Sequence, residues 1–267
     1  MTTRPSPRAA SVLAAVACLV ALSLVGGACS PLPPPPVGAS RDAANRRPIV
    51  IVHGWELFCG SEDLNVWRTW SRAARERGRG ADAVSVFSYE TCEPSAVSID
   101  RLGAFVDDVL ERTGAAKVDI VAHSLGSLIA RACVRFGRCA GKVDKFASIA
   151  GANHGTIWAN VCELAVWSRS TCDMKPDGRF LAGLNEGDET WGDVDYVTMI
   201  SWCDLTIVPF TGAALDGALN FVTDRCLSHT DWRRDRVAAD WVLDWFDGAA
   251  PVPQKPVGTN APTVAPE

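Results

Sequence analysis

The sequence predicts an α/β fold in which a mostly parallel central sheet is covered by helices on both faces. Short apolar runs of β-type composition alternate with longer segments of helical periodicity. Repeated βα units of this length place parallel strands between two layers of helices. In addition, the apolar run 118–121 leads through Ala122-His123-Ser124-Leu125-Gly126 into a helical segment. This pattern predicts a sharp strand-to-helix turn with a serine at its apex.

The individual elements follow from local composition and spacing. Strands are expected at Pro48–Val52, Ala83–Tyr89, Lys117–Ala122, Val143–Ile149, Tyr196–Trp202 and Asn220–Thr223. Helices are expected at Asp63–Arg77, Ala96–Thr113, from Ser124 to about Arg135, and Arg233–Phe246, the last with Val237, Trp241, Val242 and Trp245 facing the core. The stretch 158–191 has no regular pattern, and we interpret it as a candidate cap or lid.

Both ends of the chain are predicted to lie outside the folded domain. Residues 1–28 combine two arginines, an apolar stretch and a small-residue end, which indicates an export signal peptide. Residues 24–29 resemble a bacterial lipoprotein cleavage site, in which acylated Cys29 would attach the protein to a membrane. Alternatively, Gly26 and Ala28 suit an ordinary signal peptidase, and the protein would be secreted. A proline-rich tether is expected at 29–47, the catalytic domain at 48–247 and a disordered proline-rich tail at 248–267.

Composition narrows the function classes. The 267 residues suit one α/β domain. The formal net charge is −5, and the body of the chain has no run of Lys or Arg. Because a nucleic-acid partner requires a basic surface, we do not expect one.

The cysteines indicate an oxidising compartment. Of the ten cysteines, Cys18 is lost with the signal peptide, and eight remain besides Cys29. The chain has no Cys-x-x-Cys pair and only four histidines, so we expect four disulfides and no metal site. Eight cysteines allow 105 pairings, so the connectivity does not follow from the sequence. As a hypothesis we favour neighbours in the sequence, above all Cys203 with Cys226.

A serine nucleophile needs a base to take its proton and an acid to orient that base. When the nucleophilic serine lies in a strand-turn-helix motif, the acid comes after it in the sequence and the base comes after the acid. His229 is the candidate base, because the other downstream histidine, His154, leaves almost no room for an acid between itself and Ser124. Asp204 is the preferred acid, because it follows the predicted strand 196–202 directly. The other acidic candidates are Asp193, Asp195, Asp216 and Asp224.

The loop after the first strand carries a candidate oxyanion donor. Two backbone N–H groups must face the charge that develops on the substrate carbonyl. One is expected from Leu125 and the other from Trp55, with Gly54 bringing the chain close to the substrate. We expect His53 to order this loop from below. The remaining cleft candidates are His123, His154 and Trp158.

These motifs resemble the small secreted bacterial lipases of class 2 within the α/β-hydrolases. The resemblance rests on 48–54 (PIVIVHG), 118–126 (VDIVAHSLG) and 151–156 (GANHGT), with the placement of Asp204 and His229. It implies an α/β-hydrolase fold, a triad of Ser124, Asp204 and His229, no cofactor, and hydrolysis of acyl esters by a lipase or carboxylesterase. Two alternatives stay open: an extracellular polyester depolymerase of the polyhydroxyalkanoate type, and a non-catalytic cell-surface binding protein on a hydrolase scaffold.

Overall fold

The computed structural model describes residues 46–56, 59–60, 62–164 and 168–249, with side chains described outside 163–164. The predicted signal peptide, Cys29, the tether up to residue 45 and the tail from residue 250 lie outside the described residues. Residues 46 and 47, just before the expected start of the domain at residue 48, are among those described. Arg47 already pairs with Asp119 at 2.8 Å.

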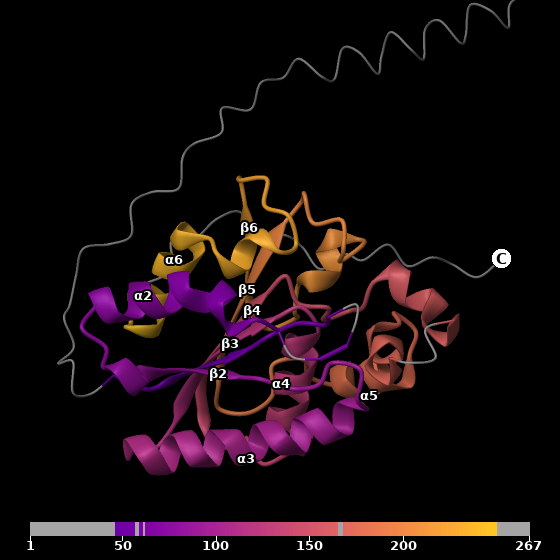
Figure 1. Ribbon diagram of the computed structural model, residues 1–267. Helices are drawn as coiled ribbons and strands as arrows, with labels where there is room; N and C mark the ends of the chain where they lie inside the picture. Colours follow the sequence, from indigo (N-terminus) through magenta and orange to yellow (C-terminus); the bar gives the residue numbers. More distant parts are fainter. Residues whose placement is uncertain (1–45, 57–58, 61, 165–167, 250–267) are drawn as a thin grey trace, which may run out of the picture. The chain divides into compact units, whose positions relative to one another are not determined.

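A sheet of six parallel strands forms the centre of the described residues (Figure 1). Its order is β2-β1-β3-β4-β5-β6. The strands are β1 (Ile49–Val52), β2 (Val84–Phe87), β3 (Val118–His123), β4 (Val143–Ile149), β5 (Asp195–Ser201) and β6 (Leu219–Thr223). Ile49, the first residue of β1, lies opposite both Val84 of β2 and Asp119 of β3. The predicted parallel sheet is therefore confirmed.

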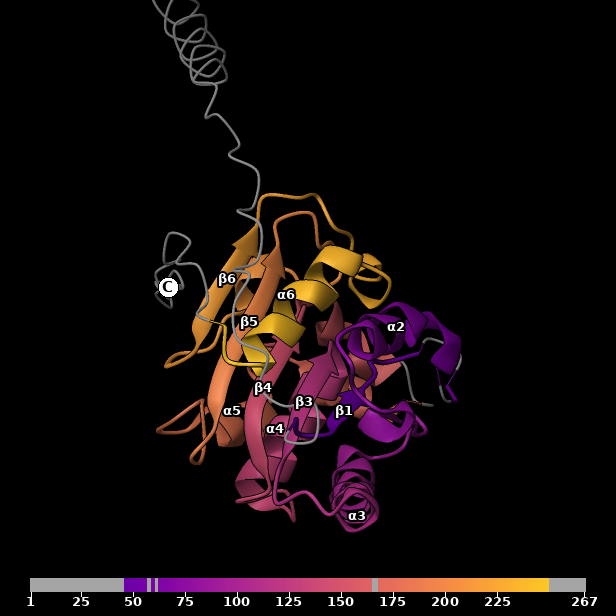
Figure 2. The same cartoon turned by 90° about the vertical axis from the view of Figure 1, so that its left-hand side faces the viewer.

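Helices cover both faces of the sheet. The α-helices are α2 (Arg68–Glu76), α3 (Ser95–Thr113), α4 (Leu125–Phe136), α5 (Arg179–Asn185) and α6 (Arg236–Phe246). Helices α2 and α6 pack together on one face, and α3 packs with α4 on the other (Figure 2). None of the helices in the described ranges combines the length and apolar character needed to span a bilayer.

Local sequence explains where the helices begin and end. Helix α3 ends at Gly114, which adopts a left-handed φ of 67° that other residues rarely take. Helix α6 begins after Asp235, whose side chain accepts a hydrogen bond from the Ala238 amide. Because the helix starts there, Ala238 and Val242 face inward, while Val237 is 44% exposed. The expectation that Val237 faces the core was wrong.

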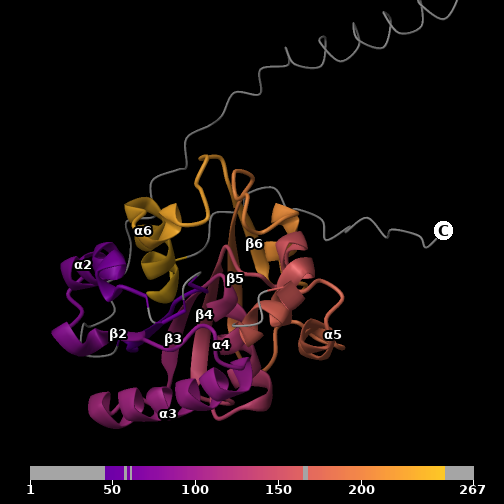
Figure 3. The same ribbon diagram turned by 45° about the vertical axis from the view of Figure 1, so that its right-hand side comes forward.

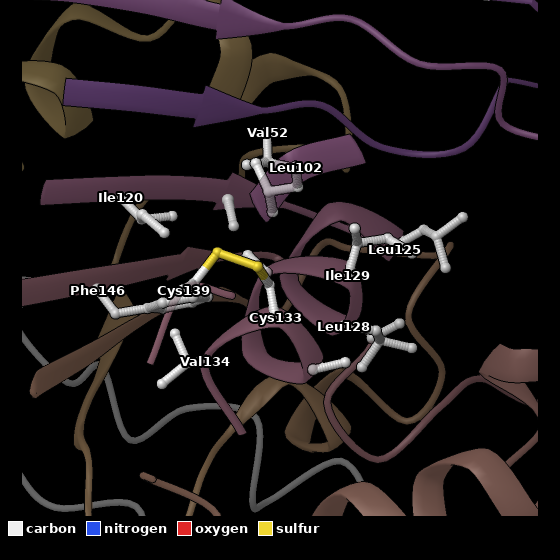
Figure 4. Close-up of a cluster of buried hydrophobic side chains, with 14 of the residues drawn as sticks. Val52, Leu102, Ile120, Leu125, Leu128, Ile129, Cys133, Val134, Cys139 and Phe146 are labelled. Atoms are coloured by element: carbon white, nitrogen blue, oxygen red, sulfur yellow. A yellow bond between two sulfur atoms is a disulfide. The ribbon is translucent and has the colours of Figure 1, made fainter. Parts of the chain in front are cut away.

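The core on the α3/α4 face contains one of the disulfides (Figure 4). Cys133 on α4 is bonded to Cys139 and lies among Leu128, Ile120 and Phe146. The other disulfides are Cys59–Cys92, Cys162–Cys172 and Cys203–Cys226. Each joins cysteines that are neighbours in the sequence, so the structure agrees with both the predicted number and the predicted pairing.

The segment after β4 is more regular than its composition suggests. It forms the 3-10 helices η5 (Ile157–Leu164) and η6 (Arg169–Met174), followed by α5. Helix α5 contacts α4, and η5, η6 and α5 lie away from α2 and α6 (Figure 3). The Cys162–Cys172 disulfide joins η5 to η6. The expected cap segment is therefore cross-linked within itself.

The strand order determines where a ligand can bind. From β1 the chain passes to β2 on one side, and β3 then pairs with the other side of β1. In open α/β sheets, ligands bind beyond the carboxyl ends of the strands where this direction changes. The residues at that point are His53-Gly54-Trp55 after β1 and Ser124 after β3.

Candidate active site

Ser124 stands at the apex of the turn between β3 and α4. Its φ of 55° and ψ of −127° are strained for a residue with a side chain. Neighbouring backbone holds this conformation, because the Ser124 amide donates to the Ile149 carbonyl at 3.1 Å and the Ala152 amide donates to the Ser124 carbonyl at 3.3 Å. The turn thus has the geometry of a nucleophile elbow.

Two glycines bring the loop after β1 against this turn. A methyl group at Gly126 would lie 2.3 Å from the His53 carbonyl oxygen and 2.5 Å from that of Val52. One at Gly54 would lie 2.8 Å from Cβ of Ser124. Since real Cβ atoms essentially never approach within 3.0 Å, only glycine fits at both positions. The elbow and the β1 loop are therefore in direct backbone contact.

Asp204 and His229, which are 25 residues apart, are joined by a hydrogen bond. Nδ1 of His229 donates to Oδ2 of Asp204 at 2.8 Å. The other carboxylate oxygen, Oδ1, accepts from the Thr206 amide at 2.8 Å and the Ile207 amide at 2.9 Å. Asp204 is only 4% exposed. With its Nδ1 proton held by a carboxylate, the His229 ring presents the Nε2 lone pair as the site that can accept a proton.

None of the alternative acids takes the place of Asp204. Asp195 and Asp193 lie at or before the start of β5, at the opposite end of that strand. Asp216 and Asp224 are exposed, and neither is bonded to a histidine. The Cys203–Cys226 disulfide lies beside the acid and joins its loop to the loop that carries His229.

His123 lies behind His229. Its Nε2 donates to the main-chain carbonyl of His229 at 2.8 Å, and the two ring centroids are 4.7 Å apart. Its Nδ1 is buried without a hydrogen-bond partner among the described residues. Burial, helped by the nearby His229 ring, places the pKa of His123 well below its usual value. His123 is thus a neutral support for the backbone of His229.

His53 supports the loop after β1 from below, as expected. The Tyr89 amide donates to its Nε2 at 3.3 Å, so its Nδ1 carries the proton and donates to the Gly54 carbonyl at 2.9 Å. The His53 and Tyr89 rings stack with centroids 4.3 Å apart. Burial lowers the pKa of His53. Neither His53 nor His123 lines the cavity described next.

A cavity of about 240 Å³ opens beside Ser124 and His229. Most of its wall is apolar. The lining residues are Trp55, Ser124, Thr156, Trp158, Ala159, Val161, Cys162, Thr171, Met174, Thr206, Ile207 and His229. Sequence reasoning named four of these, Trp55, Ser124, Trp158 and His229. The residues it missed are Thr156 just before η5, residues of η5 and η6, and residues of the turn after Asp204. Cys162 in η5 and Cys172 in η6 were the one available indication that these segments are held in place.

The other two cleft candidates lie in different surroundings. Trp158 lines the cavity, and its indole N–H donates to the Leu205 carbonyl at 2.8 Å. His154 is exposed and does not line the cavity, because its Nε2 pairs with Glu189 at 2.8 Å. Although burial alone would raise the pKa of Glu189, the interactions with His154, the Asp216 amide and Arg131 together outweigh it and lower that pKa.

The amides of Leu125 and Trp55 both lie where the elbow and the β1 loop touch. Neither amide donates to an acceptor within the described part of the chain. Leu125 is the first residue of α4, where amides have no partner inside the helix and the helix dipole favours negative charge. Within the same residues, no three His, Cys, Asp or Glu side chains are grouped to hold a metal ion.

Solved structures of lipases and esterases share this fold. Mature Bacillus licheniformis lipase BlEst2 matches 81% of this chain and 96% of its own, with a TM-score of 0.61 and 14% identity. Aspergillus fumigatus lipase B matches 81% of this chain with a TM-score of 0.62 and 14% identity, and this chain spans 56% of its length. The metagenomic carboxyl esterase MGS0156 matches 84% of this chain and 81% of its own, with a TM-score of 0.58 and 15% identity.

Sequence comparison identifies the family. Residues 46–217 match the family described as lipase (class 2). This range contains β1 with its glycine loop, the Ser124 elbow and Asp204. The chain therefore belongs to the class 2 lipase family of carboxylic ester hydrolases, as the resemblance of its motifs implied.

Proposed function

We propose that this protein is an exported serine hydrolase that cleaves acyl esters through a triad of Ser124, His229 and Asp204. The observation that carries the proposal is that Ser124 and His229 line one cavity while Asp204 holds His229 from behind. A strained serine, an oriented imidazole and a buried carboxylate are the three parts that acyl-enzyme chemistry requires.

In the proposed reaction, Oγ of Ser124 attacks the ester carbonyl carbon as its proton passes to Nε2 of His229. The Leu125 and Trp55 amides donate to the oxyanion of the tetrahedral intermediate. The C–O bond to the alcohol then breaks, the alcohol takes the proton from His229, and the acyl group stays on Ser124. Water then attacks the acyl carbon as His229 takes its proton, the bond from the acyl carbon to Oγ breaks, and the acid leaves as Ser124 recovers its proton from His229. Asp204 stabilises the imidazolium in both steps.

The cavity and its surroundings favour a poorly soluble acyl substrate. Four large apolar side chains are exposed along η5 and the acid loop: Ile157 at 46%, Trp158 at 59%, Val161 at 58% and Leu205 at 78%. Trp158 and Val161 also line the cavity. Exposed apolar surface continuous with a pocket is typical of a binding site for apolar ligands.

The apolar lining of the cavity predicts that kcat/KM depends on the length of the acyl chain. Each methylene buried in the cavity contributes about 0.8 kcal/mol, or about fourfold in kcat/KM. A series of p-nitrophenyl esters should therefore rise in kcat/KM from acetate upward and level off once the cavity is filled. A flat series would contradict an acyl-binding role for the cavity. Clearing of a polyester emulsion without activity on long-chain triglyceride would favour the depolymerase alternative.

A fluorophosphonate probe tests the proposed function directly, because it reacts only with an activated serine. The intact protein should be labelled at Ser124, and Ser124→Ala should lose both labelling and p-nitrophenyl ester hydrolysis with its fold intact. The matched control is Ser88→Ala, which removes an exposed serine outside the cavity and should label normally. A protein that folds but is not labelled would favour the non-catalytic alternative.

Export is part of the proposal. The four disulfides support an oxidising, extracytoplasmic location. Mass spectrometry of the mature N-terminal peptide distinguishes the two forms, because an acylated Cys29 indicates a cell-surface lipoprotein and an unmodified N-terminus indicates secretion. Recovery of the chain in the cytoplasm with residues 1–28 attached would contradict export.

A further inference from the structure

A cluster of buried hydroxyl groups lies behind the side chain of Trp55. The indole N–H of Trp55 donates to Oγ of Ser168 at 2.9 Å. Ser168 precedes η6 and is only 2% exposed. Its Oγ also accepts a hydrogen bond from Oγ1 of Thr171 at 2.7 Å. Trp55 is therefore tied to the segment that forms one wall of the cavity.

The cluster continues to the residue that follows Trp55. Ser170, also 2% exposed, donates through Oγ to the Thr91 carbonyl. Thr91, which is fully buried, accepts the amide hydrogen of Glu56 on its Oγ1 at 3.1 Å. Thr91 and Thr171 each lie next to a disulfide-bonded cysteine. The hydroxyl cluster is thus held by covalent cross-links on both sides.

The peptide at Trp55 is consequently fixed from three directions. On its N-terminal side Gly54 lies directly against Ser124, since a methyl group added at Gly54 would lie 2.8 Å from Cβ of Ser124. On its C-terminal side the Glu56 amide is bonded to Thr91. The side chain is bonded to Ser168. Oxyanion donors act through being oriented before the reaction, and a loop amide outside a strand or helix has no such orientation of its own.

We propose that Ser168 is a positioning residue that orients the Trp55 amide toward the oxyanion by anchoring the Trp55 indole. This inference rests on the proposed function, because it assumes that the Trp55 amide serves Ser124 chemistry. Its consequence is a split in the kinetic constants. Loss of the anchor lowers the stabilisation of the transition state, and hence kcat, whereas ground-state binding of the acyl chain, and hence KM, changes little.

A double-mutant cycle tests the proposal. Ser168→Ala and Trp55→Phe each remove the same hydrogen bond, and phenylalanine keeps an aromatic wall. Each should lower kcat on p-nitrophenyl butyrate roughly three- to tenfold, the range for one lost neutral hydrogen bond, with KM within about twofold. The fluorophosphonate reaction rate should fall in parallel. Because both changes break the same Trp55–Ser168 hydrogen bond, the double variant should be no slower than the slower single variant. Ser168→Thr keeps the hydroxyl and should restore kcat.

The control is Tyr196→Phe. It removes the hydrogen bond from the Tyr196 hydroxyl to the Trp191 carbonyl (3.0 Å) near the start of β5, at the opposite end of that strand from the acid loop. It should lower the melting temperature without changing kcat.

Three results would overturn the proposal: additive effects in the double variant, a change confined to KM, or unchanged kcat in folded Trp55→Phe. The last remains decisive if Ser168→Ala does not fold. Failure of the proposed function itself would look different, because the unaltered protein would then not be labelled at Ser124.

Discussion

Gly126→Ala tests whether the elbow and the oxyanion loop depend on direct backbone contact. The new methyl group would lie 2.3 Å from the His53 carbonyl oxygen, and real contacts begin near 3.0 Å, so this oxygen must move by roughly 0.7 Å. The His53 carbonyl cannot move alone, because it accepts the Tyr89 hydroxyl at 2.9 Å. The preceding residue, Val52, pairs with both Phe87 and Ala122. The displacement must therefore be taken up by the loop that carries Trp55.

The expected cost is mainly catalytic. A misplacement of about 1 Å lowers a rate by on the order of 10²-fold, and overpacking typically costs about 1–3 kcal/mol of folding stability. We expect kcat on p-nitrophenyl butyrate and the fluorophosphonate reaction rate to fall by about two orders of magnitude, while KM changes little.

The matched control for this substitution is Gly183→Ala in α5. A methyl group there meets no atom within 4 Å. Because alanine favours helix over glycine, this variant should gain up to about 1 kcal/mol in stability at unchanged kcat. A folded Gly126→Ala protein with full kcat would refute the reasoning, since the loop would then have moved without consequence for the oxyanion.

The remaining predictions concern the triad and pH. Asp204→Asn should lower kcat by about 10⁴-fold with the fold intact, because the asparagine amide cannot stabilise the His229 imidazolium; a loss below tenfold would contradict Asp204 as the acid. His123→Phe keeps an aromatic ring but loses the hydrogen bond to the His229 carbonyl, so kcat should fall about three- to tenfold. An unchanged kcat would show that His123 does not support His229. Burial, which outweighs the Arg47 ion pair, raises the pKa of Asp119 to about 6. Between about pH 4 and pH 6, folded Asp119 therefore keeps a proton that the unfolded chain has released. The free energy of unfolding falls by about 3 kcal/mol across this range as pH rises. Urea unfolding of Asp119→Asn should lack that loss, whereas parallel curves for the variant and the natural protein would contradict it.

Local patterns in the sequence predicted much of the framework. The alternation of apolar strands and helical segments predicted the parallel sheet, because each βα unit produces a recognisable pattern of apolar residues in one contiguous stretch of sequence. The Ser124 turn needs only a strand, small flanking residues and a helix, all of which are local. Asp204 and His229 could be proposed from chain order, and in the structure Nδ1 of His229 lies 2.8 Å from Oδ2 of Asp204.

Contacts between distant segments were decided only by the tertiary structure. The cavity wall combines η5 and η6 with the turn after Asp204, segments whose side chains show no periodicity that predicts a common surface. His123 and His154 were equal candidates in the sequence, yet one is buried behind His229 and the other pairs with Glu189 at the surface. The anchor from Trp55 to Ser168 spans 113 residues. The spacing of residues along the chain indicates which face of a helix or strand is apolar. It does not indicate which distant polar group completes a hydrogen bond, because that partner depends on how the segments pack together.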